Sequence, residues 1–372
     1  MPTRRQTLMV VLVWVLSAVL MACGGADDSR RPTRVPTRIP PTPTLRSTAL
    51  PEVDEAPAIG DAERPVTLLF AVPADRKTAT TRQIAQQLSQ YLSDSLGLSF
   101  AVELSDESSA LDLLCSGAPA LAWVSAFTYA AARQECEVTP LLAVKRGRSP
   151  DFTIGQSAEI VARTEITDLS QMAGQTFCRS DDQDVAMAWV LPALLLSSAG
   201  VNPFIELKAV RDYPDDAAVI LALQAGECAA AAFRPGDFDQ ALLDAVSAVA
   251  DVEGERPDYS DLKAAVHVIV PAADTTAPAT TGQWRGLATG VLPFEVLVAA
   301  PENALPKSLG NLENLRNSLA EQIAAFFNDR VEGTTRLKRL LDADGILPVS
   351  AQHYRSFVTM LERAGWRMAF FP

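Results

Sequence analysis

Three carboxylates crowd the start of FCRSDDQDVAMAWVLPALLL, residues 177–196, a stretch typical of a strand that runs into a helix. They are Asp181, Asp182 and Asp184, and Ser180 precedes them. A helix N-terminus has unpaired N–H groups and partial positive charge, so it binds an anion readily. Two interpretations remain open. Either the carboxylates only cap the helix, or one of them binds a cationic or hydroxyl-bearing ligand.

A second group of polar and aromatic residues follows the apolar run ALAWVSA. Tyr129 combines a ring with a hydroxyl, a common way to fix the orientation of a solute. Ser125 and Thr128 carry hydroxyls that either contact a ligand or only cap the next helix. Phe127 lies between them and completes this candidate group.

Three further places are candidates for ligand contact. Pro73 and Ala74 directly follow the apolar run VTLLFAV. Phe233 and Arg234 follow CAAAA, and Arg234 either binds a ligand carboxylate or pairs with Asp237 or another acid, which we favour. Trp189 forms either an aromatic wall of the site or part of the core.

No set of residues predicts catalysis, a metal site or a cofactor. The two histidines, His267 and His353, are far apart in the sequence and no nucleophile motif accompanies them. There is no Gly-rich phosphate loop and no Cys-x-x-Cys pair. We therefore expect a binding protein that is not an enzyme and carries no cofactor.

The first residues have the order of an export signal. Arg4 and Arg5 precede an apolar stretch, residues 8–22, and Leu20-Met21-Ala22-Cys23 resembles a bacterial lipobox. We predict a signal peptide over residues 1–22 and a lipid on Cys23. The apolar stretch is short for a bilayer span, which needs roughly 20 apolar residues. The alternatives to a lipoprotein are an ordinary secretory signal or a short anchor.

Residues 23–65 read as a tether, since RRPTRVPTRIPPTPT is rich in Pro, Thr and Arg. Such a composition cannot bury enough apolar surface to fold. Its arginines either lie against anionic lipid or remain solvated. The whole chain has a formal charge of −13, which argues against nucleic acid as a partner.

The remaining four cysteines are an even number in a chain expected to be exported. We predict two disulfides, each closing a loop within one lobe. The alternative is four buried thiols. The predicted pairs are Cys115–Cys136 and Cys178–Cys228.

The rest of the chain alternates strand and helix patterns and does so twice. In the first half a helix is expected from a Thr80–Gln83 capping box to Gly97. In the second half Pro192 predicts a kink or a fresh helix that ends before Gly200. We predict an α/β fold of two doubly wound lobes with a hinge, a ligand cleft and C-terminal helices. Lobe 1 takes residues 66–155 and 285–372, and lobe 2 takes residues 156–284.

Several phrases in this order resemble the phosphonate-type solute-binding proteins of bacterial ABC importers, two-lobed periplasmic binding proteins of type II. They are LSQYLSDSLGLSF, ALAWVSAFTYAAA, ITDLSQMAGQTF, LPFEVLVAAPENALP and LKRLLDADGILPVSAQHYRSFVTMLERAGW. The likeness covers most of residues 66–366. It implies a lipid-anchored extracytoplasmic receptor, a monomer, that closes on a small solute and delivers it to a membrane permease. It also places ligand contacts in the stretch that contains Ser125 and Tyr129.

One departure from this family makes phosphonate a doubtful ligand. Phosphonate binders begin the helix before the proline with Ser-Thr-Ser-Gly, whose hydroxyls hold the oxyanion. Here those places are occupied by Val185, Ala186, Met187 and Ala188, which donate no side-chain hydrogen bond. We therefore expect a receptor for another small organic solute. The alternatives are a sensing ectodomain of the same fold without transport, or an envelope enzyme on this scaffold.

Overall fold

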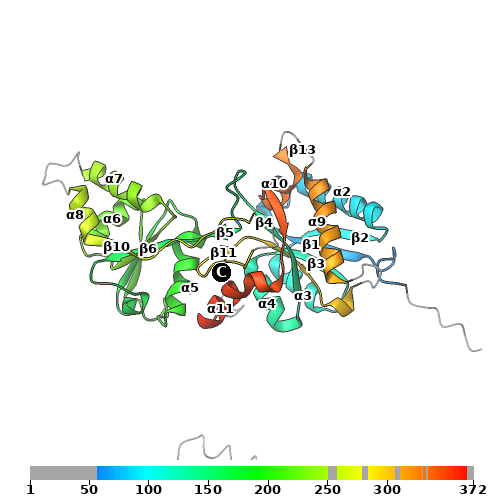
Figure 1. The fold of residues 1–372 in the computed structure, drawn as a ribbon, viewed down its shortest axis with the longest axis horizontal. Helices are drawn as coiled ribbons and strands as arrows, with labels where there is room; N and C mark the ends of the chain where they lie inside the picture. The colour runs from blue at the N-terminus through cyan, green and yellow to red at the C-terminus, as the bar shows by residue number, and fades with distance from the viewer. Residues whose placement is uncertain are drawn as a thin grey trace, which may run out of the picture. The chain divides into compact units, whose positions relative to one another are not determined.

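The protein forms two α/β lobes, each with its own β-sheet (Figure 1). The computed structural model describes residues 57–249, 258–278, 284–305, 311–328, 330–331 and 334–366. The predicted signal peptide and Cys23 lie outside the described residues. The two-lobed α/β fold expected from the sequence is confirmed.

Six strands make the sheet of lobe 1: β1 (Val66–Ala71), β2 (Phe100–Ser105), β3 (Ala120–Val124), β4 (Thr139–Lys145), β12 (Val296–Ala299) and β15 (Gly345–Pro348). Their order across the sheet is β15-β4-β12-β3-β1-β2. β1 is parallel to β2 and β3, whereas β12 is antiparallel to β3 and β4. Apolar runs such as the one in β1 are buried because helices cover both faces of the sheet.

Five helices cover this sheet: α2 (Ala79–Leu96), α3 (Glu107–Cys115), α4 (Ala126–Cys136), α9 (Leu312–Asn328) and α10 (Arg336–Leu341). α2, α9 and α10 lie on one face, and α3 and α4 on the other (Figure 1). α2 begins earlier than expected, because Thr78 rather than Thr80 accepts a hydrogen bond from the N–H three residues later, at Thr81. It ends as expected at Gly97, which has a φ of 65°.

Five strands make the sheet of lobe 2: β6 (Glu159–Arg163), β7 (Thr176–Ser180), β8 (Ala209–Tyr213), β9 (Ala230–Phe233) and β10 (Val266–Val270). Their order is β10-β6-β9-β7-β8, the same plan as β4-β12-β3-β1-β2 in lobe 1. β1 in lobe 1 and β7 in lobe 2 are each parallel to both neighbouring strands. On the far side of β3 and of β9 lies an antiparallel strand, β12 and β6 respectively. The two similar halves predicted from the sequence are confirmed.

The helical segments of lobe 2 are η2 (Leu169–Met172), the π-helical turn η3 (Ala186–Val190), α5 (Leu191–Ser198), α6 (Asp216–Gln224), α7 (Asp237–Val249) and α8 (Tyr259–Ala265). α6, α7 and α8 lie on one face of the sheet and α5 on the other (Figure 1). Pro192 lies in the first turn of α5, and Gly200 follows its end with a φ of 88°. Proline lacks an N–H, and the wider π turn before it removes the need for one. The prediction of a fresh helix at Pro192 is confirmed.

Two strand segments carry the chain between the lobes, β5 (Gly155–Gln156) and β11 (Leu292–Pro293), and they pair antiparallel (Figure 1). A Cβ at Gly155 would lie 2.5 Å from the Leu292 carbonyl oxygen, so only glycine allows this close pairing. Short elements complete the fold: η1 (Ala74–Arg76), η5 (Glu302–Ala304), β13 (Arg330–Val331), β14 (Thr334–Thr335) and η7 (Ala351–Tyr354).

The last helix, α11 (Arg355–Arg363), contacts both lobes. It packs against α5 of lobe 2, where the Ser198 hydroxyl donates to the Met360 carbonyl oxygen at 3.2 Å. One apolar cluster accordingly includes Val124 of lobe 1 and Ala162 of lobe 2. Residues of both lobes therefore share part of one core.

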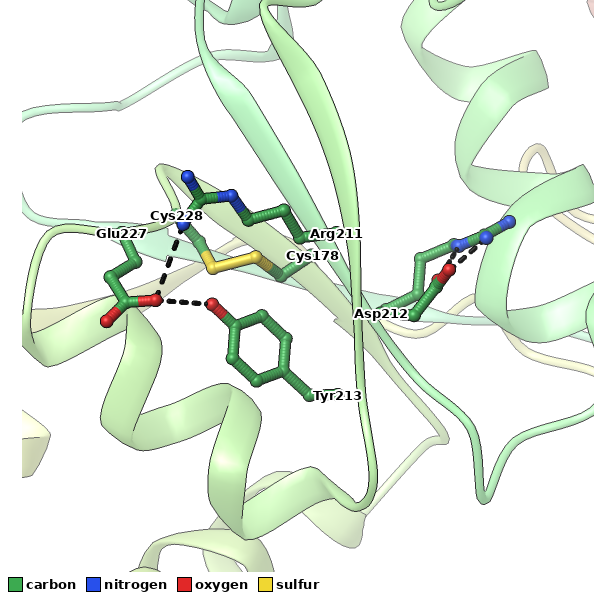
Figure 2. Close-up of a disulfide and its surroundings, with 7 residues drawn as sticks. Cys178, Arg211, Asp212, Tyr213, Glu227 and Cys228 are labelled. Carbon is green, nitrogen blue, oxygen red and sulfur yellow. Dashed lines mark hydrogen bonds and ion pairs between the residues drawn. A yellow bond between two sulfur atoms is a disulfide. The ribbon is translucent and has the colours of Figure 1, made fainter.

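Both predicted disulfides are present. Cys115–Cys136 joins the ends of α3 and α4, and Cys178–Cys228 joins β7 to the turn before β9. Figure 2 shows the second bridge beside Glu227, whose carboxylate accepts hydrogen bonds from Arg211 and the Tyr213 hydroxyl. The bridge and these bonds connect the turn before β9 to the β7–β8 edge of the sheet.

The folded part begins before Val66, so the tether ends earlier than residue 65. Gly60 donates its N–H to the Arg64 carbonyl oxygen and accepts from the Ser99 N–H at 2.6 Å. This turn is therefore fixed to the end of α2. No helix in the described ranges is long and apolar enough to cross a membrane.

Candidate functional site

The candidate residues of lobe 1 lie at the carboxyl edge of its sheet, where β1 and β3 end. Pro73 and Ala74 follow β1, are exposed and lead into η1. Ser125 follows β3 and is the N-cap of α4. In open α/β sheets this edge is where ligands bind.

Ser125 and Thr128 form a cap on α4. The Ser125 hydroxyl accepts from the Thr128 N–H at 3.2 Å, and the two hydroxyl oxygens are 3.3 Å apart. Thr128 is fully buried, whereas Ser125 is partly exposed. The capping interpretation therefore describes the bonds that these two residues make in the structure.

A third polar residue meets this cap, and it was not singled out from the sequence. Glu107 is the first residue of α3, and the Ser125 N–H lies 3.0 Å and 3.2 Å from its two carboxylate oxygens. The hydroxyls of Ser125 and Thr128 lie beside this carboxylate and lower its pKa. The N-terminus of α4 therefore already holds an anion supplied by the chain itself.

Glu107 is partly buried, and the desolvation of its carboxyl group raises its pKa above the ordinary value. Hydrogen bonds from Thr128 and Ser125 oppose this effect, and the nearby charge of Glu295 adds to it. Glu295 is itself paired with Arg146, whose nitrogen lies 2.9 Å from both carboxylate oxygens. Across the described ranges no lysine or arginine forms an ion pair with Glu107.

The two aromatic candidates of lobe 1 are packed among other rings. Phe127 lies 5.5 Å from Phe357 and 5.3 Å from Trp366, measured between ring centroids. Tyr129 is 0% exposed and packs edge-on against Tyr354 at 5.1 Å. Its burial raises its pKa to about 12, and its hydroxyl has no well-oriented hydrogen-bond partner in the described part of the chain. The Tyr129 hydroxyl therefore does not reach solvent in this conformation.

The candidate residues of lobe 2 lie at the corresponding edge of its sheet, after β7. Ser180 is buried, and its hydroxyl accepts from the Asp182 N–H at 3.3 Å. Asp184 Oδ1 accepts from the Met187 N–H at 3.1 Å, so this carboxylate caps the helical turn η3. Asp181 and Asp182 have exposed side chains. Of the three carboxylates, Asp184 is the one that caps the helix in the structure.

The residues after Asp184 provide no side-chain donor. Val185 is 66% exposed, and Met187 and Ala188 are buried. Backbone N–H groups at this helix start are engaged as well, because Met187 and Ala188 donate to the Asp184 carbonyl oxygen at 3.1 Å and 2.9 Å. An incoming oxyanion would meet apolar side chains and a carboxylate at this place.

Arg234 makes a different contact from the one favoured by the sequence. Its guanidinium donates to the carbonyl oxygen of Asp182 at 3.0 Å, and the Asp237 N–H donates to the Arg234 carbonyl oxygen. The expected ion pair of Arg234 with an acid is absent from the described residues, because the turn after β7 offers a main-chain acceptor first. Phe233 is fully buried, with its ring 5.8 Å from Phe238.

Trp189 belongs to an aromatic group on η3. Its ring lies 6.1 Å from Phe177 and 6.0 Å from Phe204, and the Arg179 guanidinium lies 5.4 Å from it. Trp189 is partly buried against the core cluster. The structure therefore places the Trp189 ring against Phe177, Phe204 and the Arg179 guanidinium.

An acidic hollow of about 660 Å³ adjoins this edge of lobe 2. It lies where β7, β8 and β9 give way to the following turns and helices. No group of three or more metal-ligating side chains with suitable geometry occurs in the part of the chain that the structure describes. The acidic side chains that line the hollow are Asp182, Asp215, Asp216, Asp237 and Asp244.

The structure thus gathers the candidates into two groups, one at each sheet edge. Lobe 1 brings Ser125 and Thr128 together with Glu107, and lobe 2 brings Ser180, Asp182 and Arg234 together. Glu107 was missed because an acidic residue in the first turn of a helix is ordinary, and its partner Ser125 is 18 residues away. Only the turn between α3 and β3 brings them into contact.

Residues 70–354 match the model of a family described as "ABC transporter, phosphonate, periplasmic substrate-binding protein". No curated protein matches the chain. Among solved structures, the methylphosphonate complex of PhnD1 from Prochlorococcus marinus is 13% identical, with a TM-score of 0.37 over 81% of this chain and 99% of that one.

Two other solved structures are similar at the same level. XAC2383 from Xanthomonas citri, bound to ATP, is 15% identical, with a TM-score of 0.41 over 81% of this chain and 96% of that one. The aliphatic sulphonate binding protein SsuA from Escherichia coli is 15% identical, with a TM-score of 0.30 over 81% and 79%. Likeness at these TM-scores says nothing about the ligand of this chain.

Proposed function

The chain belongs to the phosphonate-type family of periplasmic ABC-transporter substrate-binding proteins, and from that premise we propose a receptor for a small organic solute other than phosphonate. As a member of this family it is a solute-binding receptor that works outside the cytoplasm, in a class of transport proteins rather than enzymes. The finer proposal concerns which chemical group the solute presents. We propose a cationic or hydroxyl-bearing group.

The observation that carries the proposal is the occupied helix start in lobe 2. Asp184 binds the Met187 N–H at 3.1 Å, and Val185 to Ala188 contribute no side-chain donor. A phosphonate placed there would approach a carboxylate, and like charges at short range repel. A cation or a hydroxyl would instead find carboxylate acceptors.

The surroundings of this helix start support the same solute class. Asp181 and Asp182 are exposed nearby, and Asp182 lines the acidic hollow. Arg234 is the exposed cation at this edge, and it already donates to the Asp182 carbonyl oxygen. Solute contacts are proposed for the edge residues of both lobes: Pro73, Ala74, Ser125, Phe127, Thr128, Tyr129, Ser180, Asp181, Asp182, Asp184, Trp189, Phe233 and Arg234.

Three properties complete the proposal. The receptor is held at the membrane by a lipid on Cys23, acts as a monomer and passes its solute unchanged to an ABC permease. These properties rest on the lipobox-like Leu20-Met21-Ala22-Cys23 and on the family. Intact-mass analysis of the chain purified from membranes tests the lipid, which would add a diacylglyceryl group to a chain that begins at Cys23.

A thermal-shift panel tests the solute class. Phosphonates, amines, sugars, amino acids and vitamin-like heterocycles are added separately to the full chain in detergent. A ligand at about 100 times its dissociation constant stabilises the fold by about 2.7 kcal/mol, which raises the melting temperature by a few degrees. We expect amines or polyols to give the shift. A shift with phosphonates alone contradicts the proposal.

The absence of turnover is tested on the same samples. The ligand that shifts melting is incubated with the protein and then followed by proton NMR. A receptor returns the ligand unchanged, whereas a chemically altered ligand shows an enzyme on this scaffold. A transport assay with the neighbouring permease separates a transport receptor from a sensing ectodomain.

A further inference from the structure

A second hollow, of about 460 Å³, lies where β5 and β11 carry the chain between the lobes (Figure 1). We call it the hinge hollow. Ile154, directly before β5, lines it from the first crossing, and residues 274, 276–278 and 284–288 line it from the segment that leads from β10 to β11. None of the proposed solute contacts lines it. Its volume lies within the roughly 300–1,000 Å³ that small-molecule sites occupy, so it is large enough for a ligand of its own.

Main-chain hydrogen bonds join the walls of the hinge hollow. The Ile154 N–H donates to the Thr275 carbonyl oxygen at 3.0 Å, and the Phe294 N–H donates to the Ile154 carbonyl oxygen at 3.1 Å. On the other wall the Leu287 N–H donates to the His353 carbonyl oxygen at 2.9 Å. These bonds connect both crossings to each other and to η7. A ligand therefore meets walls that are already ordered, which lowers the entropic cost of binding.

Part of the lining is apolar. Ile154, Ala277 and Leu287 are buried and contribute only hydrocarbon side chains. Trp284 is partly exposed, and its ring packs on the His353 ring with 4.3 Å between the centroids. This contact holds the indole in place beside the hollow. Such a surface suits the aliphatic or aromatic side chain of a ligand.

The charged side chains of the lining are Arg285 and Asp274. Both are exposed, and neither forms an ion pair with any residue that the structure describes. Asp274 Oδ1 accepts from the Thr276 N–H at 2.9 Å, and this bond fixes the carboxylate. A guanidinium binds a carboxylate with two parallel hydrogen bonds, and a carboxylate binds an ammonium group. A ligand with one charge pairs with only one of these side chains, whereas a zwitterion pairs with both.

We propose that the hinge hollow is a second small-molecule site and that it binds a free α-amino acid with an apolar side chain. Arg285 binds the carboxylate of the amino acid, Asp274 binds its ammonium group, and Trp284 lies against its side chain. This inference goes beyond the proposed function, because it concerns other residues, another place in the fold and another class of ligand.

Calorimetric titration of the full chain in detergent tests the three contacts separately. L-Phenylalanine is the main probe, and each analogue lacks one feature of it. 3-Phenylpropanoate lacks the ammonium group, phenethylamine lacks the carboxylate, and glycine lacks the side chain. The variants are Arg285→Gln and Asp274→Asn, whose amide oxygen still accepts the Thr276 N–H. Arg148→Gln is the matched control, since Arg148 is exposed, precedes the first crossing and does not line the hollow.

The wild type is expected to bind L-phenylalanine at least about tenfold more tightly than each analogue, the effect of one charged hydrogen bond or of one partly buried side chain. R285Q and D274N each lose about tenfold in affinity for L-phenylalanine, and R148Q loses none. Without ligand, R285Q melts at the same temperature as the wild type, because Arg285 is exposed and has no ion pair among the described residues.

Three results would overturn the inference. They are no binding of L-phenylalanine, equal affinity in the wild type and R285Q, and equal affinity for L-phenylalanine and a singly charged analogue. The proposed function is judged separately, because a solute at the sheet edges should bind R285Q normally and Asp184→Asn more weakly. If L-phenylalanine itself behaves in that way, the amino acid is the solute of the sheet edges, and the hinge site is wrong while the proposed function stands.

Discussion

At each of the two sheet edges a carboxylate binds a backbone N–H at the start of a helix, but the surroundings of the two carboxylates differ. In lobe 1 the start of α4 receives Glu107 from another helix, and that residue is partly buried. In lobe 2 the Met187 N–H in η3 is bound by Asp184, which lies two residues before η3 and has an exposed side chain. At both helix N-termini a carboxylate of the chain occupies the position where an oxyanion would bind. Only the Glu107 carboxylate also carries a large desolvation cost.

Because their surroundings differ, the two carboxylates are expected to affect the stability of the fold differently. An exposed carboxylate three residues before the N–H that it binds is an ordinary N-cap, and such caps stabilise helices by about 1 kcal/mol. A partly buried carboxylate without an ion-pair partner lowers stability when it is ionised. Asp184 is therefore expected to stabilise the start of its helix in addition to its proposed contact with the solute.

The largest expected effect is the loss of folding stability when the disulfide of either lobe is removed. Cys178–Cys228 spans 50 residues and Cys115–Cys136 spans 21. Because longer closed loops restrict the unfolded chain more, replacing the first pair with alanines should cost about 4 kcal/mol and the second about 3 kcal/mol. Chemical denaturation of the two double variants measures this order. Equal losses, or a larger loss in lobe 1, would show that loop length does not govern the difference.

The next effect sets the two carboxylates against each other. Asp184→Ala removes the bond to the Met187 N–H and should lower the free energy of unfolding by about 1 kcal/mol. Glu107→Gln should change the same quantity in the opposite direction. Urea denaturation of both variants at neutral pH shows the signs. The comparison fails if both variants lose stability.

The pH dependence sharpens this contrast. The folded-state pKa of Glu107 is raised above its ordinary value by desolvation, so the folded protein binds this proton more tightly than the unfolded chain does. Its ionisation therefore costs stability once the pH rises through the folded pKa. Of the charged side chains around it, Glu295 acts in the same direction, with its own charge paired to Arg146.

We accordingly expect the stability advantage of E107Q to be small near pH 4 and full at neutral pH. Melting curves of the wild type and E107Q across this range measure the difference. The control is Glu103→Gln, which neutralises an exposed carboxylate on β2 of the same lobe. An advantage that shrinks as the pH rises would mean that Glu107 is stabilised, rather than strained, by its surroundings.

The smallest effect concerns the buried ring of Tyr129. Its hydroxyl lacks a well-oriented hydrogen-bond partner in the described part of the chain. Tyr129→Phe should therefore raise the free energy of unfolding by no more than about 1 kcal/mol. Tyr129→Ala would instead open a cavity at a 0% exposed position and cost about 3–5 kcal/mol. Y129F is therefore the variant that tests a solute contact, by affinity at unchanged stability. Unchanged affinity would remove the hydroxyl from the proposed site.

The sequence predicted what depends on local patterns. The fresh helix at Pro192 follows from the missing N–H of proline, whereas the π turn before it was not predicted. The cap at Asp184 lies three residues from its partner. Both disulfides were predicted because each loop closes within one lobe. The repeated order of strands was readable because the apolar runs and Gly turns recur.

What the sequence could not give depends on contacts between distant segments. Glu107 meets Ser125 only after α3 folds back onto β3, and the Arg234 guanidinium reaches Asp182 only because β7 and β9 are neighbours. The burial of Tyr129 depends on contact with Tyr354, which lies more than 200 residues later in the sequence. Spacing alone does not report such packing.

Calorimetric titration of the full chain with three related probes tests the central claim most directly. Ethanolamine carries only a cation, methylphosphonate only an anion, and aminoethylphosphonate both. If carboxylates occupy both helix starts as described, ethanolamine binds most tightly, aminoethylphosphonate less tightly and methylphosphonate not at all. Tightest binding of methylphosphonate would contradict the account, because it would show that an oxyanion displaces the chain's own carboxylates.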